Sequence, residues 1–391
     1  MSRALRLVVP MALLAGSAAA QDTTMVQGGI YQRPFIVEAG RTAVGGYAEG
    51  SASYLRTDGV GDGLNMELRR FNIFLFSGVG RRLRFISELE FEHGTEEIAL
   101  ETALLDFVVN PSLVLRAGIL LPPIGAFNVN HDSPRYEFVD RPLVSTRVFP
   151  ATLSEVGFGV HGRLAPGAVD LSYDLYLTNG LGPGVVLNGE GRTDLPSGKS
   201  EERFAEDNNG SPAVSGRIGL HAPGVGEAGL SYYGGVYNDH RVEGIRVDDA
   251  RWLHLVALDW GTELGRLRIS GEAAAARIDV APELRELFAT RQWGVYLDLV
   301  LPVWRPRIRA LRRPEVSLAA RLEHVDLNAG SFSSTGLAVG DETTALTVGA
   351  SFRPLSGTVA RVNYRAEWSR DLLRNPTSRT AGIQVGFATY F

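Results

Sequence analysis

The chain has 391 residues, no cysteine, 45 glycines, a formal net charge of −5 and a mean hydropathy close to zero. The lack of cysteine excludes a disulfide framework, and the mildly acidic balance argues against a nucleic-acid partner, which would need a basic patch. After the first twenty residues, no segment reaches 18 uninterrupted apolar residues, so a transmembrane helix is not expected.

The first twenty residues predict a secretory signal peptide. Arg3 and Arg6 form a positive start, residues 7–15 supply a short apolar core, and the small residues 17–20 form a cleavage site before Gln21. Removing them leaves about 371 residues and takes the formal net charge from −5 to −7. In an exported chain without helical spans, the composition fits a soluble β protein or an outer-membrane barrel.

Alternation of apolar and polar residues predicts strands along the whole chain. In the stretch 82–92, RLRFISELEFE, the apolar Leu83, Phe85, Leu89 and Phe91 share one face, and charged residues occupy most of the other. A period of two is strand geometry. The same pattern predicts sixteen strands, at 47–55, 64–76, 81–92, 96–109, 112–120, 155–163, 168–178, 213–221, 227–237, 250–261, 265–277, 291–301, 315–326, 342–352, 358–369 and 379–391.

Short and long connections alternate between these strands. Tight Gly- and Pro-containing links, such as 78–80 and 223–226, alternate with the long segments 121–154 and 179–212. Residues 180–212 are typical of a mobile polar loop. Membrane β-barrels alternate in this way, with short periplasmic turns and long external loops. The segment 302–314 is an exception, since it is long for a tight turn.

Aromatic residues lie at spacings that suit a membrane. Trp252 and Trp260 fall on one face of one strand, about 26 Å apart along it at about 3.3 Å per residue. With strands tilted by about 40°, this span approaches the apolar band of about 25 Å that aromatic girdles flank. Core aromatics of a β-sandwich remain the alternative.

Several stretches resemble one porin family. RRLRFISELEFE, ETALLDF and LRAGILLPPIG in the first third of the chain, then FVDRPLV and SEVGFGVHG, are similar to the early hairpins and third loop of the phosphate-selective porin O/P family of Gram-negative outer membranes. The final GIQVGFATYF resembles an outer-membrane sorting signal. The resemblance implies a sixteen-stranded barrel, usually trimeric, whose third loop folds inward and narrows the pore.

The chain departs from that family in its cationic residues. Family members often carry a polar residue and a lysine where this chain has Ile119 and Leu121, and anion-selective relatives use a lysine cluster. Lys199 is the lone lysine after the predicted signal peptide. Arginine would therefore have to supply any anion site, and its planar fork suits phosphate.

Charged residues on the face opposite the apolar one are the candidates for lining a pore. On the strands and in the segment 121–154 they are Arg82, Arg84, Arg116, Asp132, Arg135, Glu137, Asp140, Arg141, Arg147, Arg217, Arg321, Arg361 and Arg365. The segment 121–154 also contains five prolines, which stiffen it and make it the candidate constriction. Two alternatives stay open: arginines paired with acids across the strands, and an ordinary surface loop.

Together these patterns predict an all-β protein: a signal peptide at 1–20, an N-terminal lead-in at 21–46 and a transmembrane antiparallel β-barrel at 47–391, with segment 121–154 as an inward-folded third extracellular loop. We expect passive diffusion of small hydrophilic solutes or ions, including phosphate or other anions, across a Gram-negative outer membrane. The expected partners are outer-membrane lipid and further copies in a homotrimer. No HExxH or GxSxG motif is present, so neither an enzyme nor a cofactor or metal is expected. A non-conducting structural or adhesive barrel is the alternative.

Overall fold

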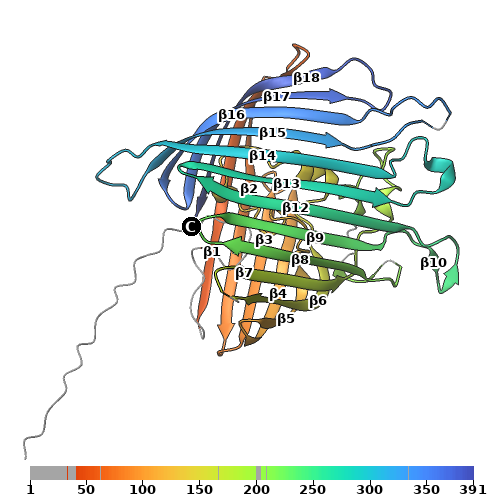
Figure 1. The fold of residues 1–391 in the computed structure, drawn as a ribbon, viewed down its shortest axis with the longest axis horizontal. Helices are drawn as coiled ribbons and strands as arrows, with labels where there is room; N and C mark the ends of the chain where they lie inside the picture. Colours follow the sequence, from red (N-terminus) through yellow and green to blue (C-terminus); the bar gives the residue numbers. More distant parts are fainter. Residues whose placement is uncertain are drawn as a thin grey trace, which may run out of the picture.

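Sixteen antiparallel strands close into one barrel in the computed structural model, which describes residues 33, 41–61, 63–165, 167–199, 204–207, 209–332 and 334–391 (Figure 1). The barrel strands are β1 (Thr42–Thr57), β2 (Leu64–Val79), β3 (Leu83–Glu92), β4 (Glu97–Asn110), β5 (Leu113–Leu120), β6 (Glu155–Leu164), β7 (Asp170–Thr178), β8 (Ala213–Ala222), β9 (Gly226–Val236), β12 (Trp252–Leu264), β13 (Leu267–Ile278), β14 (Arg291–Trp304), β15 (Glu315–Asp326), β16 (Glu342–Leu355), β17 (Thr358–Arg370) and β18 (Ser378–Tyr390). Consecutive barrel strands are neighbours throughout.

The structure confirms the predicted sixteen-stranded barrel and differs at a few boundaries. Strand β1 begins at Thr42, inside the predicted lead-in, because Gly45 and Gly46 pair with β2 although two successive glycines favour a turn. A two-stranded hairpin of β10 (Arg241–Val242) and β11 (Ile245–Arg246) was not predicted. The predicted signal peptide lies outside the described residues. Among the described residues, no helix has both the length and the apolar character to cross a membrane.

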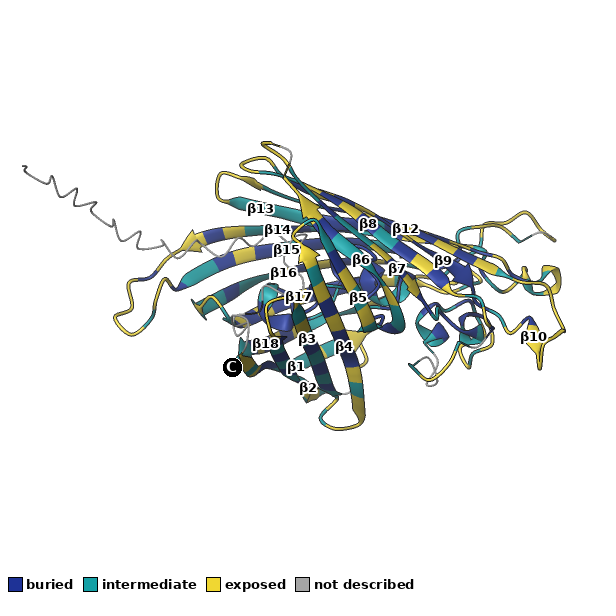
Figure 2. Ribbon diagram, turned by 90° about the horizontal axis from the view of Figure 1, so that it is seen from below, coloured by how far each residue is buried: buried dark blue, intermediate teal, exposed yellow. Residues whose placement is uncertain are grey.

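Side chains alternate between the two faces of the wall, as the banding along the strands in Figure 2 shows. On β18, Ile383, Val385 and Phe387 point outward and are 54%, 46% and 54% exposed, whereas Gln384 and Ala388 are buried inside. The outer surface is therefore apolar along the middle of the strands. Such a surface suits lipid better than water.

The barrel closes where the first strand meets the last. Strand β1 pairs with β18 from Tyr47↔Tyr390 to Thr57↔Thr380. Phe391 extends the ladder, because its backbone N–H donates to the carbonyl of Gly46 at 3.0 Å. The ring of Phe391 stacks on Phe71 at a centroid distance of 5.5 Å. The last residues are thus paired on both sides, and no open sheet edge remains at the chain end.

An apolar core fills part of the barrel interior at the end opposite Phe391, and we call this end the loop end. Residues of segments 121–154 and 179–212 pack there against inward side chains of β12 and β13; they include Val144, Phe149, Leu181, Val185, Leu195, Leu253 and Leu255. The prediction of a mobile polar loop at 180–212 thus missed that its described apolar residues, such as Leu181 and Leu195, are buried in this core. The few apolar residues of this segment are dispersed among Gly, Pro and Asn, so the sequence pattern did not indicate that they are buried together.

An arginine placed on the outward face of β12 should destabilise the barrel more at the middle of the membrane than near its surface. Leu258 lies at the middle of the strand and Leu264 at its end, and both side chains point outward. We expect Leu258→Arg to lower the free energy of unfolding from lipid vesicles by about 2–4 kcal/mol, because the guanidinium would lie near the bilayer midplane. Leu264→Arg, the matched control, should cost about 0–1 kcal/mol. Urea titrations measure both, and equal costs would contradict a membrane-spanning β12.

Candidate functional site

Residues 121–154, between β5 and β6, cross the interior of the barrel. The backbone N–H of Ala126 donates to Glu272 Oε2 on β13 at 3.1 Å. Five residues later, His131 Nε2 lies 3.2 Å from Glu101 Oε2 on β4, on the opposite side of the ring of strands. The segment therefore bonds to the wall on both sides of the lumen.

A buried asparagine holds the two ends of this segment together. Asn128 Nδ2 donates to the carbonyl of Pro122 at 2.8 Å and to that of Leu153 at 3.1 Å, and Asn128 Oδ1 accepts from the Leu153 N–H at 2.8 Å. Because prolines fix the backbone φ at five further positions, little freedom remains between these anchors. The segment is thus a stiff insert whose charged side chains have defined positions.

Three carboxylates of the segment are each paired with an arginine outside it: Asp132 with Arg33 at 2.9 Å, Glu137 with Arg353 at 2.8 Å, and Asp140 with Arg69 at 2.8 Å. Burial alone would raise the pKa of each carboxyl, but the neighbouring arginines outweigh burial and lower all three pKa values below the ordinary range. These groups therefore stay ionised at neutral pH.

Two arginines of the segment make contacts of different strength. Arg135 Nε donates to Tyr390 Oη on β18 at 3.0 Å, and its side chain is mostly buried. Arg147 Nη2 lies 3.7 Å from Glu367 on β17, and 40% of its side chain is exposed. Arg135 is therefore a structural contact, and Arg147 is open to the interior space.

Most of the candidate arginines on the wall are paired with acids of nearby strands. The pairs are Arg116 with Asp106 at 2.8 Å, Arg217 with Asp259 at 2.7 Å, Arg321 with Asp298 at 2.6 Å, Arg361 with Glu49 at 2.9 Å, and Arg365 with Glu323 at 2.8 Å. Arg82 lies in the turn before β3 and Arg84 near the same end of that strand, and both are exposed. The charges of the five paired arginines are neutralised by their acidic partners, so these arginines offer little attraction to a passing ion.

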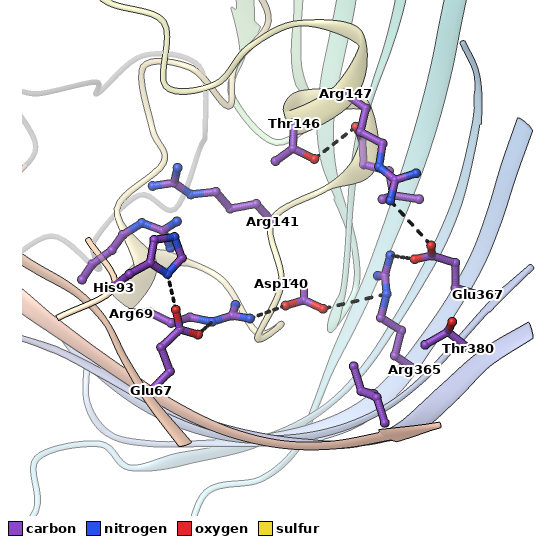
Figure 3. Close-up of a pocket in the computed structure, with 13 residues that line it drawn as sticks. Glu67, Arg69, His93, Asp140, Arg141, Thr146, Arg147, Arg365, Glu367 and Thr380 are labelled. Carbon is purple, nitrogen blue, oxygen red and sulfur yellow. Dashed lines mark hydrogen bonds and ion pairs between the residues drawn. The ribbon is translucent and has the colours of Figure 1, made fainter. Parts of the chain in front are cut away.

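A cavity of about 380 Å³ lies at the loop end between segment 121–154 and the wall formed by β17, β18, β1 and β2 (Figure 3). Five arginines line it together with three carboxylates and one histidine: Arg69, Arg70, Arg141, Arg147 and Arg365, with Glu67, Asp140, Glu367 and His93. Asp140 lies between Arg69 and Arg365, with Arg365 Nε at 3.8 Å. The lining thus carries an excess of positive charge.

Arg141 is a buried arginine of this cavity with weak contacts, since Nη1 donates to Thr152 Oγ1 at 3.5 Å. Its Nε and Nη2 have no hydrogen-bond partner, although about nine-tenths of its side chain is buried. Its Nη2 lies 4.0 Å from Glu90 Oε1, beyond hydrogen-bond distance. Figure 3 shows its side chain reaching into the cavity without an interaction to the other lining residues. These donors are available to an anionic oxygen, for which a guanidinium fork is well suited.

Sequence reasoning missed Arg69, Arg70 and Glu101, because β-bulges interrupt the alternation at these residues. The register of β2 against β1 shifts between Glu49 and Gly50, so that Arg69 and Arg70 both face the interior. A second shift places Glu101 and Thr102 inside together. Bulges re-aim side chains in this way. The available indication was two adjacent polar residues, RR and ET, inside strands that otherwise alternate.

The closed antiparallel barrel, with a connection folded through its lumen, has the fold of outer-membrane porins. Similar solved structures are the anion-selective porin from Comamonas acidovorans (TM-score 0.57, 12% identity, covering 90% of this chain and 99% of that one) and Salmonella typhi OmpF in complex with daunomycin (TM-score 0.57, 12% identity, 90% and 98%). A third is the outer-membrane channel DcaP of Acinetobacter baumannii (TM-score 0.52, 12% identity, 91% and 99%). At these identities the similarity concerns the fold.

In sequence, the chain is similar to an uncharacterized protein of Aquifex aeolicus (strain VF5), with 27% identity over 365 residues that cover 87% of this chain and 78% of that protein. No protein-family model matches the chain.

Removing one partner of the buried ion pair Arg321–Asp298 should strongly lower the free energy of unfolding. We expect Arg321→Met to lower the free energy of unfolding by about 3–5 kcal/mol, because Asp298 would remain buried without its counter-charge. Arg305→Met is the matched control: its pair with Glu315 is at 2.9 Å but its side chain is 68% exposed, so the expected cost is about 0–1 kcal/mol. Removing both partners, with Asp298→Leu and Arg321→Met, should recover most of the loss. Urea unfolding measures all three variants, and a double variant as unstable as Arg321→Met would show that the ion pair is not the cause.

Proposed function

We propose that the protein is an outer-membrane porin through which small hydrophilic solutes diffuse passively, and that segment 121–154 sets the width and the charge of the passage. The segment bonds to opposite sides of the wall, and its backbone is stiffened by proline and Asn128. An insert fixed in this way narrows the lumen permanently and does not act as a gate. The predicted signal peptide and the porin fold support a Gram-negative outer membrane as its location.

Within that function we propose a preference for anions of the phosphate or carboxylate type. The observation that carries this preference is the cavity at the loop end, where five arginines face three carboxylates. Rings of cationic side chains in a pore favour anions. The resemblance to the phosphate-selective O/P family supports the same ion sign, with arginine taking the place of lysine.

Arg141 is the residue on which this preference depends most. Five candidate arginines of the wall are neutralised by short ion pairs, whereas Arg141 keeps two nitrogen atoms without an acceptor. A conducting pore has to bind an ion well enough to admit it and weakly enough to release it. One incompletely paired arginine beside a paired group such as Arg69–Asp140 meets this requirement better than a cluster of free cations would.

Planar bilayers test the proposal directly. We expect stepwise conductance from the purified protein and, under a KCl gradient, a reversal potential of the sign for anion preference. Arg141→Gln should shift that potential toward the value for a non-selective pore, because it removes the incompletely paired charge of the cavity. Arg246→Gln, the same change in the exposed β10–β11 hairpin, should leave the potential unaltered.

Two results would count against the proposal. A folded barrel that stays electrically silent would favour the structural or adhesive alternative. Conductance with equal shifts in the Arg141 and Arg246 variants would retain a pore but remove the cavity as its selectivity site.

We also propose that the porin is a homotrimer, as the family resemblance implies. The outer face of β4 to β7 carries an apolar groove of about 500 Å³ lined by Leu105, Phe107, Leu115, Phe158 and Leu175, among others. An apolar outer surface can contact either lipid or another copy of the chain. Native mass spectrometry from detergent should give a mass of about three chains, and conductance steps should come in groups of about three. A single-chain mass with single steps would contradict the trimer.

A further inference from the structure

A buried group of side chains with metal-ligand chemistry joins segment 121–154 to β3 and β4, outside the cavity of Figure 3. It consists of Glu88, Glu101 and His131, which are 0%, 4% and 0% exposed. One ligand atom from each lies within 4.8 Å of the other two. His131 Nε2 is 3.2 Å from Glu101 Oε2 and 3.9 Å from Glu88 Oε1.

The bulge in β4 brings these groups together. In strict alternation, only one of Glu101 and Thr102 could face the interior, but the register shift against β3 buries both. Thr102 lies directly opposite Glu88 in the ladder, so the two side chains are on the same face. The bulge thus adds the Glu101 carboxylate beside Glu88 without exposing a charge on the outer surface.

The orientation of the imidazole favours a cation between His131 and the two carboxylates. His131 Nδ1 lies 2.9 Å from the backbone carbonyl of Asn128, and since a carbonyl oxygen only accepts, Nδ1 is the protonated donor. Nε2 is left facing Glu101 and Glu88. Histidines that ligate metal ions commonly donate their second N–H to a carbonyl in this manner, which fixes the ligating tautomer.

Two further buried oxygen atoms in this region have no donor. Thr102 Oγ1 and Asn72 Oδ1 are without hydrogen-bond partners, and both residues are fully buried. The Asn72 amide belongs to the group, because its Nδ2 donates to Glu88 Oε1 at 2.6 Å. Oxygen atoms that are buried without a donor are unfavourable, and a bound cation would compensate for this.

The nearby charges also leave room for a cation. Arg33 is shared between Glu88 Oε2 at 2.7 Å and Asp132 at 2.9 Å, so Glu88 Oε1 remains directed at His131. Glu90, on the same face, is paired with Arg70 Nε at 3.5 Å and is therefore not counted with this group. Of the two carboxylates of the group, Glu88 is paired with Arg33, which Asp132 shares, and Glu101 is paired with His131. The two carboxylates thus have one arginine between them.

We propose that Glu88, Glu101 and His131 bind a divalent transition-metal ion of the Zn²⁺ type, which fastens segment 121–154 to the wall across the lumen from Glu272. Imidazole favours Zn²⁺ over Mg²⁺ or Ca²⁺, and Zn²⁺ also accepts carboxylate oxygen. Ligands at about 2.0–2.2 Å from one ion lie up to about 4 Å apart, which small side-chain rotations would achieve.

Zinc binding by the purified, untagged protein tests the site independently of conductance. After EDTA treatment and gel filtration, Zn²⁺ is titrated in competition with a chromophoric chelator. We expect about one equivalent per chain, and a loss of affinity of more than about tenfold in both His131→Gln and Glu101→Gln. His161→Gln is the matched control, because His161 is another inward histidine beside a carboxylate, Asp106 at 3.3 Å, outside the group. It should bind within about twofold of the unaltered protein.

Heat-dependent gel mobility verifies that each variant has folded, and the unaltered protein decides the outcome if a variant does not fold. Failure of that protein to retain Zn²⁺ at micromolar concentration would overturn the site and leave protons as the neutralising cations. Zinc bound equally well by the folded His131 and Glu101 variants would also overturn it, because the ion would then lie elsewhere. Neither result would bear on whether the barrel conducts.

Discussion

The pairing of β1 with β18 is the contact on which the other features of the barrel depend. In lipid, each strand N–H and carbonyl needs a protein partner, so a sheet with two open edges could not remain there. The ladder from Tyr47↔Tyr390 to Thr57↔Thr380, extended by Gly46 and Phe391, supplies these partners. Closure also assigns every side chain to one of two environments. A chain end that would be an exposed apolar edge in an open sheet becomes part of a continuous wall.

Closure has a second consequence, since it concentrates charge in a confined space. Inward arginines meet inward acids on nearby strands at hydrogen-bond distance, as Arg217 does with Asp259 and Arg321 with Asp298. Charged side chains of the wall also bond to the backbone of segment 121–154: Glu272 accepts from the N–H of Ala126, and Arg321 donates to the carbonyl of Asp140. The segment is therefore held by charged side chains of the wall as well as by the apolar core. In the function that we propose, selectivity arises from the few charges that pairing leaves incomplete, with Arg141 first among them.

The strands could be predicted because alternation is strong where one face is apolar and the other charged. The prediction failed where alternation is weak, at the glycines that begin β1, and where apolar residues are dispersed, in 179–212. At the candidate site, Asp140, Arg141, Arg147 and Arg365 were among the predicted residues, and the structure brings them to one cavity. Their pairing partners depend on the register between strands, which a single strand's pattern does not contain.

The two bulges explain why Arg69, Arg70 and Glu101 were missed. A regular strand offers one inward side chain for every two residues, and the intervening one faces lipid, where an arginine near the midplane costs about 2–4 kcal/mol. A bulge turns two successive side chains inward and so raises the local density of polar groups without that cost. Both bulges lie where the wall meets segment 121–154: the first supplies Arg69 and Arg70 beside Asp140, and the second supplies Glu101 beside His131. One backbone irregularity, used twice, thus provides cations on β2 and an additional carboxylate on β4 at the places where the segment is anchored.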